Sequence, residues 1–158
     1  MGKLTLTKHG GAVNALLSFY KNKVDELEEA GQYFMAAVAL AFALETVILS
    51  YLLVELEEDE TGQIGIPDSV SMSGLVDAAN YIGALDAPID VPSHSRNDGS
   101  LPKHIAKDAV EQINKIRRLI HPARALNEGF DPASFTQEQL REYREMYESV
   151  THSLLYYI

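Results

Sequence analysis

The stretch QYFMAAVALAFALETVILSYLLVEL, which runs from Gln32 to Leu56, decides the fold of this chain. Its residues are apolar without a break from Tyr33 to Leu44, and one acid, Glu45, lies near its middle. A helix that is apolar on every side is either the central helix of a bundle or a membrane span. Because a charge at the centre of a bilayer costs roughly 2.5–3.5 kcal/mol, Glu45 favours the central buried helix, and we expect no membrane partner.

The other helical patterns are shorter and would surround this central helix. Apolar residues recur in each at intervals of three and four, which places them on one helical face. The segments are Ala12–Ala30, Ser73–Leu85, Ser100 to Pro122 with a continuation through Ala123–Leu126 that stops at Gly129, and a last helix that follows Thr136. The sequence therefore predicts an all-α fold, an up-and-down helical bundle of about five helices, in a single domain spanning residues 1–158.

The last helix has the most distinct start. Thr136 and Gln139 have the spacing of a capping box, in which each side chain bonds the other residue's backbone N–H. Apolar and tyrosine residues then follow at alternating intervals of three and four, the pattern of a narrow seam. They are Leu140, Tyr143, Tyr147, Val150, Leu154 and Tyr157. Such a seam packs either within the bundle or against a second subunit, and the sequence leaves both open.

The composition limits the compartment and the partners. None of the 158 residues is cysteine, which fits a reducing compartment, so we expect a cytoplasmic protein. A formal net charge of −10 repels nucleic acid at long range. The window Lys103–Arg124 departs from this balance, because six basic and two acidic residues give it +4 and leave −14 elsewhere. The acids gather in Asp25–Glu29 and Glu55–Glu60, which we expect to be solvated helix ends.

The basic window contains the residues that could perform chemistry. Arg117 and His121 are four apart, so on one helix they share a face, with Asn114, Arg118 and Arg124 on or beside it. An arginine can neutralise a phosphate, and a histidine can act as general acid or base near neutral pH. These are the minimum parts for metal-independent cleavage of RNA, in which a 2′-hydroxyl attacks its own phosphate.

Two neighbouring residues would shape this site. Pro122 has no N–H to donate to the carbonyl of Arg118, so we expect a kinked helix end with a free acceptor there. Glu45 needs a partner if it is buried. That partner is either a basic side chain or helix terminus within the bundle, or one of the candidate site residues Arg117, Arg118 and His121. The sequence contains no zinc-ligand spacing and no Gly-rich phosphate loop, so we expect no metal and no cofactor.

The segment RRLIHP, Arg117–Pro122, resembles the signature of the HEPN superfamily, in which an Arg, often followed by Asn, precedes a His late in a long helix. Ala43-Leu44-Glu45 and the segment from Leu75 to Asp86 are also similar to uncharacterised bacterial relatives in that superfamily. The resemblance covers Gln32 to Leu126. It differs in having Arg118 at the usual Asn position and three residues between Arg117 and His121, where the nuclease signature has four to six.

The resemblance implies a helical bundle that forms a homodimer, and it leaves three functions open. The first is a dimerisation and interaction module, part of a bacterial toxin–antitoxin or defence system with a protein partner, without robust catalysis. The second is a metal-independent endoribonuclease that uses Arg117 and His121 on RNA. The third is binding of a nucleotide or another phosphorylated ligand by Asn114, Arg118, Arg124 and Glu45. The shortened spacing favours the first.

Overall fold

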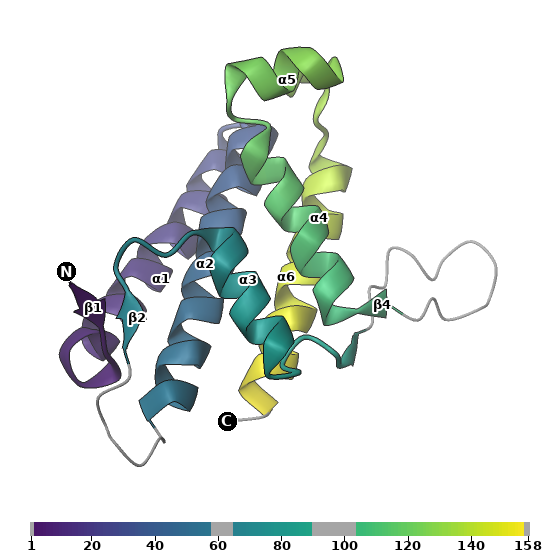
Figure 1. The fold of residues 1–158 in the computed structure, drawn as a ribbon. Coiled ribbons are helices and arrows are strands. Elements are labelled where there is room, and N and C mark those ends of the chain that lie inside the picture. The colour runs from purple at the N-terminus through teal and green to yellow at the C-terminus, as the bar shows by residue number, and fades with distance from the viewer. Residues whose placement is uncertain (1, 58–64, 90–103, 157–158) are drawn as a thin grey trace.

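The computed structural model describes residues 2–57, 65–89 and 104–156, and these residues form six α-helices packed in one bundle (Figure 1). The helices are α1 (Leu6–Glu29), α2 (Tyr33–Glu57), α3 (Met72–Tyr81), α4 (Ala106–Arg118), α5 (Pro122–Glu128) and α6 (Gln137–Tyr156), with a 3₁₀ turn, η2 (Pro132–Ser134), before α6. The all-α class is confirmed. The number of helices is one more than predicted, because the pattern before and after Pro122 forms two helices.

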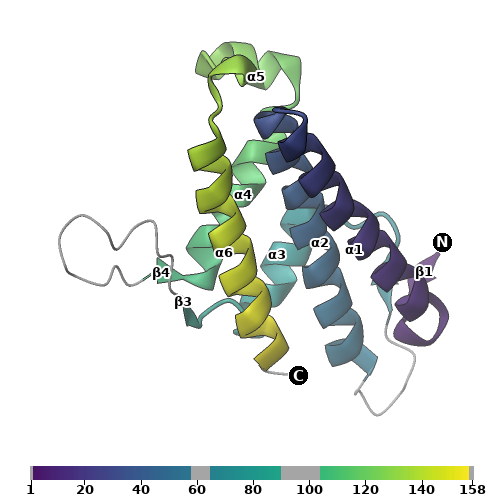
Figure 2. The ribbon, with the colours of Figure 1, turned by 180° about the vertical axis from the view of Figure 1, so that it is seen from behind.

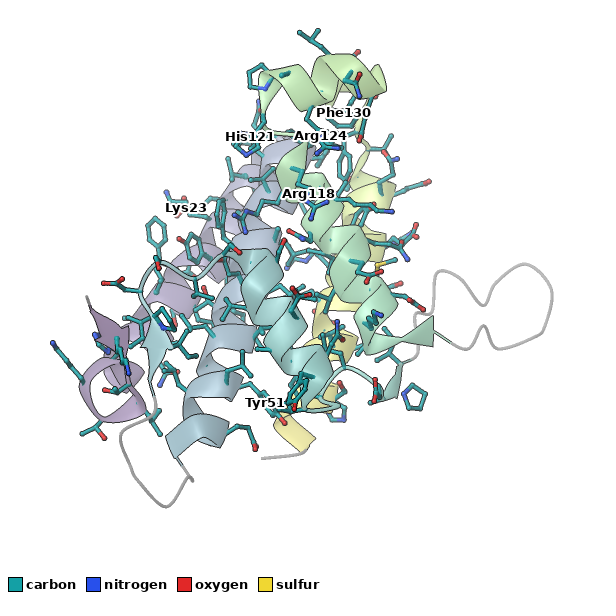
Figure 3. The ribbon with its side chains drawn as sticks, in the orientation of Figure 1. Lys23, Tyr51, Arg118, His121, Arg124 and Phe130 are labelled. Carbon is teal, nitrogen blue, oxygen red and sulfur yellow. The ribbon has the colours of Figure 1, made fainter. Side chains whose placement is uncertain are left out.

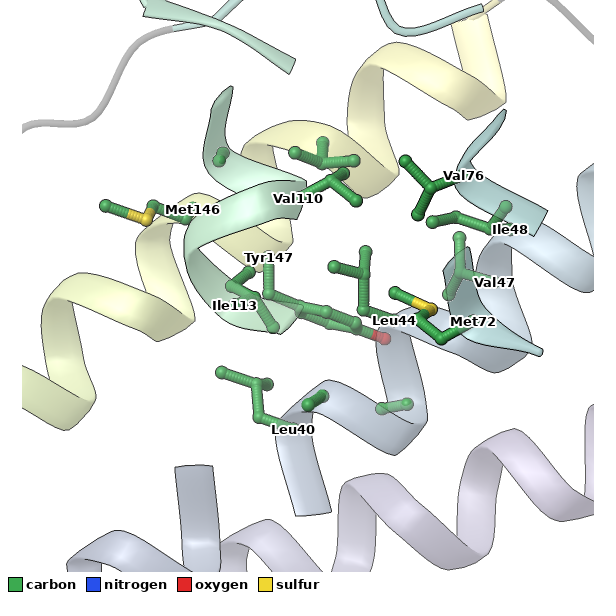
Figure 4. Close-up of a cluster of buried hydrophobic side chains, with 14 of the residues drawn as sticks. Leu40, Leu44, Val47, Ile48, Met72, Val76, Val110, Ile113, Met146 and Tyr147 are labelled. Carbon is green, nitrogen blue, oxygen red and sulfur yellow. The ribbon is translucent and has the colours of Figure 1, made fainter. Parts of the chain in front are cut away.

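Helix α2 lies at the centre and contacts α1, α3, α4 and α6. Its side chains Leu44, Ile48 and Leu53 are fully buried, and they meet residues of α3, α4 and α6 in one continuous core (Figure 4). Helix α2 is also long and apolar enough to cross a membrane, although 72% of its most apolar window is buried inside the bundle. A core helix and a membrane span share this composition, so the composition alone does not separate them.

Helices α1 and α2 form a hairpin that reverses at Gly31, whose φ of 74° lies in the left-handed region. Helix α1 begins six residues earlier than predicted, at Leu6. Its N-terminus is capped by Thr5, whose side chain accepts a hydrogen bond from the Lys8 backbone N–H at 3.3 Å. The paired glycines after His9 weaken the sequence pattern, but the cap and the contact with α2 keep this turn helical.

Four two-residue strands were not predicted. Strand β1 (Lys3–Leu4) pairs with β2 (Ile66–Pro67), and β3 (Pro88–Ile89) pairs with β4 (His104–Ile105), both antiparallel. The second pair corrects the start of the fourth helix, because His104 and Ile105, which were expected to be helical, form β4 and α4 begins at Ala106. Ser100, where that helix was expected to start, lies outside the described residues. Helix α3 begins one residue earlier than predicted, at Met72 after a cap formed by Ser71, and it ends at Tyr81, before the predicted Leu85.

The break between α4 and α5 occurs close to the predicted position. Helix α4 ends at Arg118, Pro122 is the first residue of α5, and Gly129 ends α5 with a φ of 64°. The prediction of a free carbonyl at Arg118 is wrong, because the His121 backbone N–H donates to the Arg118 oxygen at 3.2 Å. Helix α5 lies across one end of the bundle, which departs from a simple up-and-down path (Figure 1).

Helix α6 starts with the predicted capping box. The Thr136 N–H donates to Gln139 Oε1 at 2.8 Å, and the Gln139 N–H donates to Thr136 Oγ1 at 3.2 Å. Its seam residues Tyr147, Val150 and Leu154 are buried against α2 and α4. The sequence left open whether this seam packs within the bundle or against a second subunit. In the structure the seam packs within the bundle.

Candidate functional site

Arg117 is anchored inside the fold by two contacts. One guanidinium nitrogen lies 3.0 Å from Glu45 Oε2, and the guanidinium carbon lies 5.4 Å from the centre of the Phe42 ring. The Arg117 and Glu45 side chains are 29% and 23% exposed, so the ion pair is largely shielded from solvent. A planar guanidinium that pairs with a carboxylate and packs over an aromatic face is held in one orientation. Arg117 therefore connects α4 to α2.

This contact also explains the acid in the middle of the apolar helix. Glu45 faces the gap between α2 and α4, where Arg117 neutralises its charge. The prediction that Glu45 requires a basic partner is confirmed, and the partner is one of the three residues named for it. Phe42 was missed by sequence reasoning. Its position three residues before Glu45 places both side chains on the same face of α2, which is the signal that could have identified it.

His121 lies outside α4 and does not share a helical face with Arg117, which corrects the sequence prediction. It is the N-cap residue of α5, with an extended backbone at φ −78° and ψ 121°, and its side chain is exposed. The physical reason is the tight turn after Arg118. Three successive backbone hydrogen bonds of the i to i+3 type, ending at His121, take the chain away from the α4 axis before Pro122 starts a new helix.

The structure instead brings His121 together with two other predicted residues. Arg118, His121 and Arg124 line one shallow, open hollow at the junction of α4 and α5, together with Ala123 and Asn127 (Figure 3). The guanidinium groups are only loosely held, by Ser73 Oγ at 3.5 Å from Arg118 and by Glu128 Oε1 at 3.7 Å from Arg124. We call this place the basic hollow.

Asn114, the remaining predicted site residue, is half-buried on α4 one turn before Arg117 and Arg118, and it does not line the basic hollow. The predicted site is thus divided into two parts. One is the anchored Glu45–Arg117 pair, and the other is the exposed basic hollow. The hollow presents three basic side chains that could hold an anion, whereas the guanidinium of Arg117 already has a carboxylate partner.

These features define a helical bundle with a basic hollow between two consecutive helices. Among the described residues, no group of three or more His, Asp or Glu side chains is placed to hold a metal ion. Comparisons with models of known protein families, with curated proteins and with solved structures found no match.

Proposed function

We propose that this chain is a HEPN-like helical interaction module that forms a homodimer and has no robust nuclease activity. The observation that carries the proposal is the 3.0 Å ion pair between Arg117 and Glu45, together with the separation of Arg117 from the helix that His121 caps. The HEPN resemblance would assign Arg117 a role in a nuclease site, where it would supply the positive charge for the scissile phosphate. That charge is neutralised here by Glu45, so the two residues do not form a working pair within one subunit.

Exposed apolar side chains on α5 and in the turn before it support the homodimer. Leu126 on α5 is 82% exposed, and Ile120, in the turn before α5, is 40% exposed. A contiguous exposed apolar patch often marks an interaction surface, and Leu126 and Ile120 would contribute to such a patch. A second copy that covers Leu126 and Ile120 would place two basic hollows near one another. The same surface could receive the protein partner expected of a toxin–antitoxin or defence system.

The test combines oligomeric state with RNA cleavage. We expect light scattering to give a dimer for the wild type, and Leu126→Glu to shift it toward monomer without changing the helical circular dichroism signal. We expect no cleavage of a mixed-sequence RNA in the presence of chelator, with His121→Ala indistinguishable from wild type. Cleavage by the wild type that His121→Ala abolishes would replace this proposal with the nuclease. If light scattering gives a strict monomer, the proposed homodimer is wrong.

A second candidate is binding of a nucleotide or another phosphorylated ligand in the basic hollow. It is favoured by the loosely held guanidinium groups of Arg118 and Arg124 beside His121. Calorimetric titration with adenosine monophosphate tests it. We expect Arg118→Gln to weaken binding about tenfold, as for one charge-assisted contact, while Lys115→Gln, an exposed cation elsewhere on α4, changes little. Equal losses in both variants would indicate unspecific attraction to positive charge.

A further inference from the structure

A second hollow, independent of the proposed function, is lined by residues of α1, α2 and α6. Helices α1 and α6 run along the side of the bundle that faces the viewer in Figure 2. The volume of the hollow is about 410 Å³, which falls in the range of small-molecule sites. Arg144 of α6 borders it and bridges to α1, with one nitrogen 2.9 Å from Asp25 Oδ1 and another 2.9 Å from Glu28 Oε1. This double ion pair connects the two helices.

The floor of this interhelical hollow is apolar. Val24 of α1 and Leu40 of α2 line it and are 2% and 3% exposed, and the half-buried Leu17 of α1 lies beside them. None of these side chains can satisfy a hydrogen bond from water. An apolar body placed on this floor would exclude water without loss of any polar contact, so the floor favours a ligand with a hydrocarbon portion.

Two hydroxyl groups on α6 add polar contacts to the floor. Tyr147 and Thr151 are one helical turn apart and both line the hollow. The Thr151 oxygen is buried and lies near the Tyr147 hydroxyl, although no hydrogen bond of good geometry reaches it within the described part of the chain. Burial also raises the pKa of the Tyr147 phenol, so this group stays neutral. The Thr151 oxygen has only this contact with Tyr147, so it can accept a further hydrogen bond, and a ligand donor in the hollow would supply it.

Charged side chains at the rim of the hollow determine which ligand charge is favoured. Within the hollow, Lys21 and Arg144 balance Asp25 and Glu148. A neighbouring groove along α1 and α6 shares Asp25, Arg144 and Glu148 with the hollow. The groove adds four acids and one base: Glu28, Glu29, Glu138, Glu145 and Arg141. The combined lining carries a net charge of −3 from six acids against three bases, not counting His152. A cation is therefore attracted to this end of the bundle, and an anion is repelled.

We infer that the interhelical hollow is a binding site for a small organic cation with an apolar body. The body would rest on Leu17, Val24 and Leu40. The cationic group would lie at the rim beside the Glu148 carboxylate, and a donor of the ligand would reach the Thr151 oxygen. The basic hollow is lined by α4 and α5 and shares no residue with this site, so the two can be tested separately.

The test uses three probes of similar size and different charge, namely 2-phenylethylamine, 2-phenylethanol and 3-phenylpropionate. Each is titrated into the full chain at neutral pH, and amide shifts are followed by heteronuclear NMR. We expect saturable shifts at residues 17–25 and 147–152 for the amine, with roughly tenfold tighter binding than for the carboxylate. Glu148→Gln should weaken amine binding about two- to fivefold, as for one partly exposed charge contact, and leave the alcohol unchanged.

Two variants and a control separate the site from unspecific binding. Leu17→Phe fills the hollow and should abolish shifts from the amine and the alcohol alike. If that variant does not fold, the nearly isosteric Thr151→Val keeps the shape and should weaken binding of both probes. Glu111→Gln removes an exposed acid from α4 and should have no effect. Absence of saturable shifts at millimolar probe, equal affinity for amine and carboxylate, or an effect of Glu111→Gln as large as that of Glu148→Gln would overturn the inference.

Discussion

The Glu45–Arg117 pair provides the sharpest test of how this fold is held together. Replacing Glu45 with Gln keeps the side-chain size and removes the charge that neutralises Arg117. The guanidinium would remain over the Phe42 ring with 29% of its side chain exposed. It would then be partly desolvated without an anionic partner, which is the usual reason why the loss of one member of an ion pair is destabilising.

The size of the effect follows from the exposure of the two side chains. A fully exposed pair contributes about 0.2–1 kcal/mol, and breaking a fully buried one costs about 3–5 kcal/mol. Since both side chains here are roughly a quarter exposed, we expect Glu45→Gln to lower the free energy of unfolding by about 1–2 kcal/mol. For a chain of 158 residues this corresponds to a fall of about 2–8 °C in the melting temperature.

The assay is a double-mutant cycle with Glu45→Gln and Arg117→Gln, measured by urea denaturation. We expect a coupling energy of about 1 kcal/mol or more between the two positions. Lys23 and Glu26 on α1 supply the matched control, because their ion pair is as short, at 2.9 Å, but 45% and 63% exposed. Their coupling should stay below about 0.5 kcal/mol. Equal coupling in the two cycles would refute the view that Arg117 is anchored by a shielded contact.

Three further variants test local features of the bundle. Thr136→Ala removes half of the capping box and should lower the free energy of unfolding in urea by about 1 kcal/mol. Gly129→Ala places a Cβ on a residue with a φ of 64° and should cost about 1 kcal/mol in the same assay, even though no atom lies within 4 Å of that Cβ. Because burial raises the pKa of Tyr147, the folded state keeps this phenol neutral while the unfolded phenol ionises near pH 10. Stability should therefore fall as pH rises above about 10, and Tyr147→Phe should make that fall shallower in urea titrations between about pH 9 and pH 11.

Features fixed by short stretches of the chain could be predicted from the sequence. The central helix followed from its unbroken apolar composition, and the start of α6 followed from the spacing of Thr136 and Gln139. The end of α5 followed from Gly129, because a left-handed residue is the usual end of a helix. Each of these signals acts within a few residues, so no knowledge of the tertiary fold was needed.

Features that depend on distant contacts could not be predicted from the sequence in the same way. The pairing of Pro88–Ile89 with His104–Ile105 joins segments fifteen or more residues apart, and neither has a strand pattern of its own. The division of the candidate site depends on where α4 ends. Proline at position 122 indicates a break, but the helix ends four residues earlier, because the last turn tightens at Arg118. This shift separates His121 from Arg117.

Charge and geometry together limit what the basic hollow would bind if the proposed function is correct. The chain carries −10 overall, so a long polyanion is repelled over most of the surface. The hollow offers Arg118, Arg124 and His121, and Arg117 is already paired. Two guanidinium groups can neutralise about two phosphates, which gives a salt dependence with a slope of only about −1 to −2 on a logarithmic scale. A short anionic group, on a nucleotide or a partner protein, therefore suits this hollow better than extended RNA.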